Sequence, residues 1–334
     1  MPNPLYDSLF GKHKTNKTTF LHLLNGEIIS YENFLHLSSR YANTLLKMGL
    51  SKGDRVAIQV KKSPESLAVY TACVQSGLVF LPLNTAYTPT ELTYFLEDSQ
   101  AKLFIGEDSK KKELIEITKK TGSIFETLGL EGKSTFDKKS QKMSDFFKTI
   151  DQDMDDLVAI LYTSGTTGRP KGAMLTHRNL LSNVEALAYS WRFSENDILL
   201  HALPIYHTHG LFVAINVTLF SGSSIMFLTE FSLDSVIKNI PNATVMMGVP
   251  TFYIRLLSDP RFDRDVTKKM RLFVSGSAPL LAETHSQFEE RTGHRILERY
   301  GMTETNMNTS NPYDGERRAG TVGIPLPGIE LRIK

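Results

Sequence analysis

The chain has 334 residues, more than one ordinary domain holds, so we expect two packed subdomains. Hydrophobic residues make up 41% and charged residues 22%, a balance typical of a globular protein with a sizeable core. A net charge of +2 gives no reason to expect nucleic acid or an anionic membrane surface as a partner, and nine scattered histidines and one cysteine, Cys73, indicate neither a zinc cluster nor a disulfide framework.

The first twenty residues carry no recognisable targeting signal. They lack the continuous apolar core of a secretory signal and the Arg-rich pattern of a transit peptide. The most apolar later stretch, residues 210–220, is too short to span a bilayer and contains Asn216. We therefore expect a cytoplasmic protein without a membrane span.

A regular alternation of β-rich and helical segments begins near residue 54. Thr88, followed by Pro89 and by Glu91 at the third helical position, predicts a capping box at the start of one helix. Strands that alternate with helices of this length favour a parallel α/β sheet. The predicted strands are 54–60, 79–84 and 101–107, and the predicted helices are 64–77, 88–100 and 110–120.

Residues 131–156 interrupt this alternation with mixed charge and few aliphatic side chains. They are interpreted as the connection between two subdomains, with an irregular helical excursion as the alternative. The predicted domains are accordingly 1–156 and 157–334.

The second half opens with an apolar strand, 157–161, that stops at a run of Thr, Ser and Gly. Glycines let the backbone turn and present N–H groups to phosphate oxygens, hydroxyls add donors, and a lysine adds positive charge. The spacing differs from a Walker A loop, and a plain surface linker is the alternative. The residues concerned are Thr163, Ser164, Gly165, Thr166, Thr167, Gly168, Lys171 and Gly172.

Strands and helices then alternate to the end of the chain. In open α/β sheets, ligands collect at the carboxyl ends of the strands, and four such ends carry polar residues: 163–172, 204–210, 275–279 and 300–305. The predicted strands are 197–204, 223–228, 244–250, 270–277, 295–301 and 328–334, and the predicted helices are 176–192, 208–220, 232–240, 251–257 and 279–293.

The segment 300–305 suits a nucleotide. Tyr300 offers a flat face for a purine, and Gly301 lets the backbone approach it. Thr303 can donate to a phosphate, and Glu304 can hold a hard cation such as Mg²⁺. A β-turn with incidental charge is the alternative.

Together, 163–172 and 300–305 resemble the phosphate loop and the following motif of the adenylate-forming superfamily, which includes acyl-CoA synthetases, luciferases and peptide-synthetase adenylation domains. The resemblance implies the α/β fold of the large N-terminal domain, with two parallel-sheet subdomains packed together. Members of the superfamily continue well beyond residue 334, so it also implies that the C-terminal lid domain is absent and that turnover is severely weakened. The implied chemistry is attack of a carboxylate on the α-phosphorus of ATP, followed by acyl transfer to coenzyme A.

The resemblance also implies roles for individual residues. His207 corresponds to a histidine beside the attacked carbonyl, whereas His209 has no clear counterpart. The implied catalytic residues are Lys171, Thr303 and His207, and Mg²⁺ would be held by Glu304 and Thr163. The implied ATP-binding residues are Thr163, Ser164, Gly165, Thr166, Thr167, Gly168, Lys171, Gly276, Ser277, Ala278, Glu298, Arg299, Tyr300, Gly301, Met302 and Thr303.

Segments 201–214, 247–257, 272–281 and 298–317 resemble the malonyl-CoA synthetases of this superfamily in particular, which implies malonate or methylmalonate as the acid. A second carboxylate needs a cation in the acyl pocket, because burying it unpaired costs several kcal/mol. Arg255 is the candidate, with Arg299 and Arg271 next. The other implied substrate-binding residues are His207, Thr208, Ser277 and Met307.

Other functions remain open at this point. A synthetase for a short monocarboxylic acid is favoured if Arg255 points to solvent. A non-catalytic nucleotide-binding module would bind ATP without releasing pyrophosphate. A peptide-synthetase adenylation domain normally has an aspartate for the amino group of its substrate, and the pocket segments contain no convincing one.

Overall fold

A computed structural model describes residues 3–129, 134–163 and 168–332. The chain divides into two compact units. Unit 1 comprises Met1–Lys17 and Tyr31–Leu181, and unit 2 comprises Thr18–Ser30 and Ser182–Lys334. The predicted boundary after residue 156 differs from this division, because the strand that starts at Leu157 pairs within the sheet of unit 1.

Unit 1 is built on a sheet in the order β6-β5-β3-β4-β7-β8, parallel except for the antiparallel pair β7 and β8. The alternation in the sequence correctly predicts β3, β4, β5 and β7. It misses β6, and it misses β8 because that strand starts within the glycine-rich segment. The strands are β3 (Arg55–Gln59), β4 (Val79–Pro82), β5 (Leu103–Glu107), β6 (Ile124–Leu128), β7 (Leu157–Thr163) and β8 (Lys171–Thr176).

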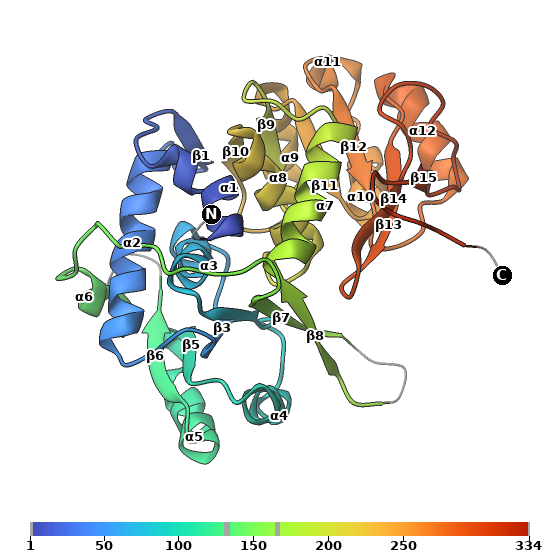
Figure 1. Ribbon diagram of the computed structural model, residues 1–334. Coiled ribbons are helices and arrows are strands. Elements are labelled where there is room, and N and C mark those ends of the chain that lie inside the picture. Colours follow the sequence, from blue (N-terminus) through green and yellow to red (C-terminus); the bar gives the residue numbers. More distant parts are fainter. Residues whose placement is uncertain (1–2, 130–133, 164–167, 333–334) are drawn as a thin grey trace. The chain divides into compact units, whose positions relative to one another are not determined.

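Helices cover both faces of this sheet. Figure 1 shows α2 and α3 on one side of it and α4 and α5 on the other. The predicted helices α3, α4 and α5 are confirmed. The helices are α1 (Pro4–Leu9), η1 (Gly11–His13), α2 (Tyr31–Lys47), α3 (Pro64–Ser76), α4 (Pro89–Ser99), η2 (Asp108–Lys110), α5 (Lys111–Thr121) and α6 (Thr135–Ser140), with α7 (His177–Ser190) running from unit 1 into unit 2.

The predicted capping box at the start of α4 is present. The Thr88 hydroxyl accepts a hydrogen bond from the Glu91 N–H, and the Glu91 carboxylate accepts one from the Thr88 N–H at 2.8 Å. In α3, Cys73 is fully buried, and burial raises the pKa of its thiol. A buried neutral thiol behaves as a small hydrophobic side chain, as the sequence indicated.

The segment 131–156 does not connect the two units, which corrects its first interpretation. It lies inside unit 1, where the described part forms α6 and then an irregular run. The Tyr41 hydroxyl donates to Asp137 at 2.5 Å, and the Ile150 N–H donates to the carbonyl of Gln75 at 3.0 Å. These bonds hold the segment against α2 and α3, so the alternative of an irregular helical excursion describes it better.

Unit 2 contains a sheet of nine described strands in the order β15-β14-β13-β12-β11-β9-β10-β1-β2. Five predicted strands are confirmed, whereas β1, β2, β14 and β15 were missed. The strand predicted at 328–334 is wrong for the described residues 328–332, which carry no strand. The strands are β1 (Thr19–Leu23), β2 (Ile28–Ser30), β9 (Ile198–His201), β10 (Ser224–Phe227), β11 (Val245–Gly248), β12 (Leu272–Ser275), β13 (Leu297–Met302), β14 (Asn306–Ser310) and β15 (Ile324–Pro325).

A buried apolar cluster joins one face of this sheet to helices α9, α10 and α12. Tyr253 from α10, Phe273 from β12 and Phe288 from α12 meet edge to face in it. The cluster thereby holds together elements that are distant in sequence. The helices are η3 (His209–Ile215), α8 (Asn216–Ser221), α9 (Leu233–Asn239), η4 (Ile240–Asn242), α10 (Pro250–Leu257), α11 (Arg264–Thr267) and α12 (Ala282–Thr292).

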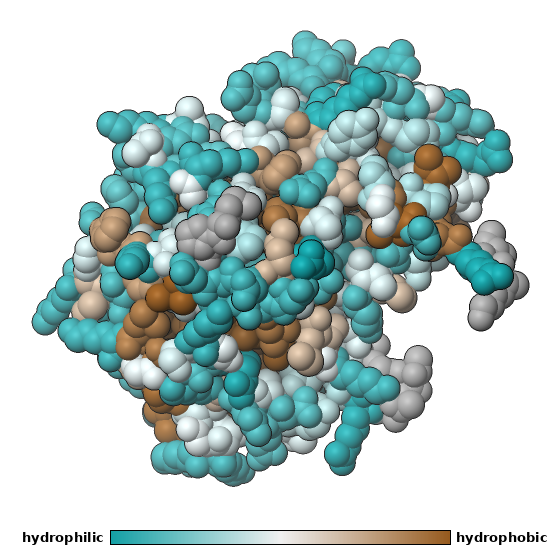
Figure 2. Space-filling model, viewed as in Figure 1, coloured by the Kyte–Doolittle hydropathy of each residue, from teal (hydrophilic) through white to brown (hydrophobic). Residues whose placement is uncertain are grey.

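Polar residues dominate the surface that can be seen. Figure 2 shows hydrophilic residues over most of the visible face, with hydrophobic residues in small groups between them. None of the helices in the described ranges combines the length and apolar character needed to cross a membrane.

A buried ion pair supports the strand ends opposite the candidate site. Arg271 binds both carboxylate oxygens of Asp197 at 2.7 Å, so Arg271 is engaged in a structural contact. Burial alone would raise the pKa of Asp197, but the hydrogen bonds from Arg271, the Ser194 N–H and Thr244 lower it.

Replacing Asp197 by Ala should destabilise the protein strongly, because it leaves Arg271 without its counter-charge. We expect a loss of about 3 kcal/mol in the free energy of unfolding, measured by urea titration. The exposed pair Asp155 and Arg178 is the control, and Asp155→Ala should leave the unfolding midpoint nearly unchanged. Equal losses for the two variants would contradict this assignment.

Candidate functional site

The helix η3 follows β9 with an unusually wide turn. The carbonyl of Thr208 accepts hydrogen bonds from the N–H groups of both Phe212 (2.9 Å) and Val213 (3.0 Å), which is the π-helical pattern. Gly210 is required here, because a Cβ at this position would lie 1.9 Å from the carbonyl oxygen of Pro204. Such turns are rare and occur often at functional sites.

A pocket of about 410 Å³ lies in unit 2 at the carboxyl ends of β9, β11, β12 and β13. Its size suits a small acid. It brings together three of the four segments that the sequence singled out: 204–210, 275–279 and 300–305. The lining residues are Leu203, Pro204, His207, Thr208, His209, Gly210, Val249, Ser277, Arg299, Gly301, Met302, Thr303 and Met307.

Arg299 is the only Lys or Arg side chain in this lining, and it is 3% exposed on β13. Its Nε and Nη2 atoms are buried without a hydrogen-bond partner among the described residues. Burial therefore lowers the pKa of Arg299, since no anion in the described part of the chain compensates the lost hydration. A buried guanidinium without an anionic partner is costly in a folded protein, and such groups concentrate at functional sites.

Gly276 gives Arg299 the space for this position. A Cβ at residue 276 would lie 2.4 Å from Cζ of Arg299 and 2.5 Å from its Nε. The guanidinium thus packs directly on the backbone of the turn after β12. This contact explains a glycine at 276 that the sequence assigned to nucleotide binding.

Buried His209 and exposed Ser277 contact each other on the pocket wall. Nδ1 of His209 lies 3.2 Å from Oγ of Ser277, whose backbone φ of +72° is uncommon for a residue with a side chain. Burial first, and then electrostatic interaction with Arg299, His201 and His207, hold the pKa of His209 well below its ordinary value. His209 is therefore neutral near pH 7.

Buried neutral histidines make the stability depend on pH. Because the pKa of His209 is lower in the folded protein than its ordinary value of 6.5, the unfolded chain binds a proton that the folded chain does not. The free energy of unfolding should then fall as the pH drops below about 6.5, by up to about 1.4 kcal/mol per pH unit for each such group. Urea titrations at pH 7 and 5 should show a shallower dependence for His209→Gln, and an unchanged slope would contradict the buried neutral state.

The β13–β14 hairpin forms another wall. Asn183 holds the backbone of Met307 from both sides, donating to its carbonyl at 2.8 Å and accepting from its N–H at 3.2 Å. A Cβ at Gly301 would lie 2.2 Å from the carbonyl oxygen of Asn306, so glycine permits the close crossing of the two strands. Met307, which is 2% exposed, is thereby fixed in the lining.

Other predicted nucleotide-site residues lie around the pocket. Tyr300 is 42% exposed, and Ala278 is exposed in the turn after Ser277. Glu298 does not line the pocket: its carboxylate accepts the N–H groups of Leu280 and Gly320, both at 3.2 Å, and burial raises its pKa. It ties two loops to β13.

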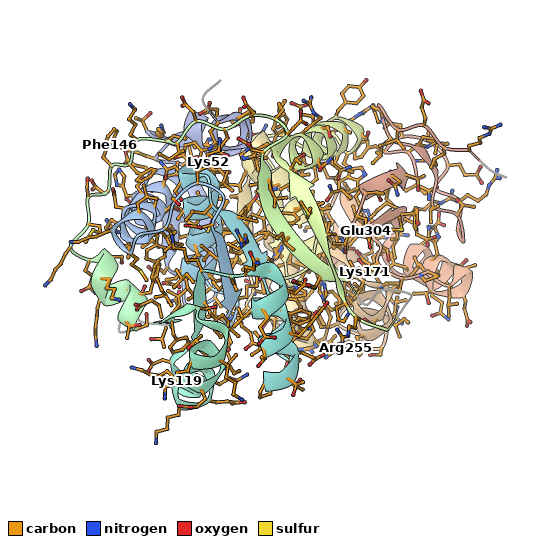
Figure 3. The ribbon with its side chains drawn as sticks, turned by 60° about the horizontal axis from the view of Figure 1, so that its bottom comes forward. Lys52, Lys119, Phe146, Lys171, Arg255 and Glu304 are labelled. Carbon is orange, nitrogen blue, oxygen red and sulfur yellow. The ribbon has the colours of Figure 1, made fainter. Side chains whose placement is uncertain are left out.

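Arg255, the first candidate for the second carboxylate, does not line the pocket. Helix α10 buries Pro250, Tyr253 and Leu256, and Arg255 lies on its exposed face. Its guanidinium stacks on the ring of Phe231 at 4.7 Å. Figure 3 shows Arg255 apart from Glu304, which belongs to the same unit. The structure brings Arg299 into the pocket instead.

The predicted phosphate loop belongs to unit 1, where it joins β7 to β8. Thr163 and Lys171 are paired across this antiparallel hairpin, and Gly168 has a φ of +94°. Lys171 is exposed at the first position of β8, as Figure 3 shows. The other predicted loop residues, Ser164, Gly165, Thr166 and Thr167, lie outside the described residues.

Glu304, the predicted metal ligand, is exposed at the tip of the β13–β14 hairpin. Within the described part of the chain, no group of three or more His, Cys, Asp or Glu side chains is arranged to hold a metal ion. Mg²⁺ is often held by one or two carboxylates together with substrate phosphates, so a single carboxylate at this place fits the ion.

Comparison with known proteins gives a consistent set of relatives. The family described as AMP-binding enzyme matches residues 11–334. A malonate–CoA ligase of Arabidopsis thaliana is 37% identical over 308 residues, which cover 86% of this chain and 51% of that protein. The chain thus spans about half the length of the curated relatives it matches.

Solved structures also resemble this chain. ATP-bound MatB from Rhodopseudomonas palustris superposes with a TM-score of 0.95 at 52% identity, over 98% of this chain and 65% of that one. A malonyl-CoA ligase product complex with methylmalonyl-CoA and AMP bound gives a TM-score of 0.81 at 32% identity, over 99% of this chain and 67% of that one.

Proposed function

This chain belongs to the AMP-binding enzyme family, and on that basis we propose that it forms the large domain of an ATP-dependent acid:CoA ligase for malonate or methylmalonate. The carboxylate attacks the α-phosphorus of ATP, which gives an acyl-adenylate and releases pyrophosphate. The thiol of coenzyme A then takes the acyl group and AMP leaves.

The observation that carries this proposal is Arg299. A dicarboxylate presents one carboxylate to ATP and must place the other in the pocket. The fork of an arginine binds both oxygens of a carboxylate, and Arg299 lines the pocket with no counter-charge among the described residues. A monocarboxylic acid would leave this buried cation unpaired, which is unfavourable by several kcal/mol.

The relatives support the same acid. Malonate is in the name of the Arabidopsis thaliana ligase, and the product complex contains methylmalonyl-CoA. The exposure of Arg255 alone would favour a monocarboxylic acid, but Arg299 supplies the cation that this alternative lacks. Thr208 and Met307 line the pocket and are placed to decide whether a methyl branch at C2 fits.

We assign most of the other predicted site residues to the binding of ATP. Two anions meet in the first step, so donors and cations must spread the developing negative charge. We assign this role to Lys171, to the loop 163–168 and to Thr303, with the adenine ring beside Tyr300. Mg²⁺, held by Glu304 and Thr163, would neutralise part of the phosphate charge. His207, whose pKa burial lowers, stands as a neutral group on the acyl side.

Isotope exchange tests the proposal. Malonate should promote exchange of labelled pyrophosphate into ATP in the presence of Mg²⁺, whereas acetate should not. Exchange with acetate and not with malonate would assign a monocarboxylic substrate. ATP binding by calorimetry without any exchange would favour a nucleotide-binding module over a ligase.

A further inference from the structure

Helix α4 is hydrogen-bonded to both sides of the β7–β8 hairpin in unit 1. Tyr94 and Asp98 lie one helical turn apart, so they belong to the same face of α4. The hydroxyl of Tyr94 donates to the carbonyl of Pro170 at 2.9 Å, directly before β8 begins. The hydroxyl of Tyr162, next to the last residue of β7, donates to the Asp98 carboxylate at 2.5 Å. One face of α4 thus holds the hairpin on both of its sides.

Aromatic rings pack between α4 and the hairpin. The rings of Tyr94 and Tyr162 meet edge to face with centroids 6.2 Å apart, and the Phe95 ring lies 4.4 Å from that of Tyr162. Tyr162 pairs across the hairpin with Gly172, where an added Cβ would lie 3.5 Å from Cζ of the tyrosine. The tyrosine ring therefore packs against the backbone of β8, so packing and hydrogen bonds fix the hairpin together.

Tyr162 keeps its hydroxyl proton at neutral pH. Burial raises the pKa of Tyr162, and the hydrogen bond and the charge of Asp98 raise it further. The neutral phenol is therefore a permanent donor to the carboxylate. Hydrogen bonds to a carboxylate are shorter and stronger than those between neutral groups, so this contact holds although Asp98 is exposed.

The hydrogen bond from Tyr94 acts on the peptide unit to which Lys171 belongs. The carbonyl of Pro170 and the N–H of Lys171 share one planar peptide group, so fixing the carbonyl fixes the direction in which the chain enters Lys171. Lys171 is exposed at the first position of β8, where it pairs with Thr163. A lysine is a point charge on a flexible stem, so the place of its backbone decides which oxygens it reaches.

We propose that Tyr94 and Asp98 are positioning residues for ATP, which hold Lys171 where it meets the outer phosphates. The inference rests on the proposed function, in which Lys171 spreads the charge of the reacting phosphates. It adds two residues that act through the hairpin rather than on the nucleotide. A hairpin that is fixed in advance loses less conformational freedom when ATP binds, so more of the interaction energy appears as affinity.

Tyr94→Phe removes the hydroxyl and keeps the ring, so the aromatic packing persists. Calorimetry with a non-hydrolysable ATP analogue should show roughly 3- to 10-fold weaker binding, as expected for the loss of one hydrogen bond. The affinity for AMP, which lacks the outer phosphates, should stay at the wild-type value. Tyr189→Phe is the matched control, because Tyr189 is 79% exposed on α7, and it should leave both affinities unchanged.

Two substitutions of Asp98 test the other side of the hairpin. Asp98→Ala removes the acceptor of the Tyr162 hydroxyl and should weaken binding of the ATP analogue by a similar factor. In Asp98→Asn the amide oxygen still accepts this hydrogen bond, so much of the lost affinity should return. Because Asp98 is exposed, the unfolding midpoint should change little in either variant. Equal affinity losses for the two variants would contradict a role for this hydrogen bond.

A double-mutant cycle shows whether Tyr94 acts through Lys171. Lys171→Ala alone should weaken binding of the ATP analogue at least about tenfold, and adding Tyr94→Phe should then reduce the affinity little further. Fully additive losses, or an equal loss of AMP affinity in Tyr94→Phe, would indicate general structural support and overturn the inference. If Lys171→Ala left the affinity for the ATP analogue unchanged, the role that the proposed function gives to Lys171 would itself fail, which distinguishes the two failures.

Discussion

Arg299→Leu should weaken malonate binding by about 3 kcal/mol, or roughly 100-fold, in calorimetry with saturating ATP analogue. The guanidinium is the cation of the described pocket lining, so its removal leaves the second carboxylate buried without a counter-charge. Leucine fills a similar volume without a polar group. The free protein should not lose stability, because an unpaired buried cation has been removed.

Arg255→Ala is the matched control for this experiment. Arg255 is exposed and stacks on Phe231 outside the pocket lining, so its loss should change malonate affinity little. The affinity for the ATP analogue should remain unchanged in both variants. If Arg255→Ala abolished malonate binding while Arg299→Leu retained it, the assignment of the two arginines would be reversed.

Gly276→Ala should weaken malonate binding at least about tenfold without changing any charge. The added methyl group would lie 2.4 Å from Cζ of Arg299, so the guanidinium must move. Displacements of about 1 Å in a substrate-positioning group can cost two orders of magnitude in rate. Because the end of a flexible side chain yields, the thermal unfolding midpoint should change little.

Gly129→Ala provides the control for the general effect of a glycine substitution. No atom lies within 4 Å of a Cβ at that position. It should therefore leave malonate affinity at the wild-type value. Equal affinities for the two alanine variants would show that Gly276 does not position Arg299.

Local patterns in the sequence predicted most of the parallel strands and their helices. The capping box at Thr88 was identified because its signals lie within four residues. The strands β1 and β2 were missed, because their place in the sheet of unit 2 depends on pairing between Leu21 and Ile225, which are 204 residues apart in the sequence. β8 was missed because Gly172 and its neighbours resemble a loop in composition.

The sequence predicted those pocket residues that lie at or after the carboxyl ends of strands. His207, Thr208, Ser277, Thr303 and Met307 were all proposed from the sequence and all line one pocket. The nucleotide loop stays a proposal, because most of it lies outside the described residues.

The choice of arginine required the structure. On a two-turn helix such as α10, a shift of one position along the sequence is enough to move a side chain from the buried face to the exposed face. Tyr253 is buried, whereas Ile254 and Arg255 are exposed. In the sequence, Arg299 is one charged residue among others in a predicted strand. Its burial without a hydrogen-bond partner for Nε and Nη2 among the described residues is what supports the proposed role.

The most direct measurement compares malonate with malonamate, which has the same size and a neutral amide at one end. With ATP analogue bound, wild-type protein should bind malonate roughly 100-fold more tightly, and Arg299→Leu should bind the two acids with similar affinity. Such a result would tie the preference for a dicarboxylate to Arg299. Equal affinity of wild-type protein for malonate and malonamate would contradict a dicarboxylate site in this pocket.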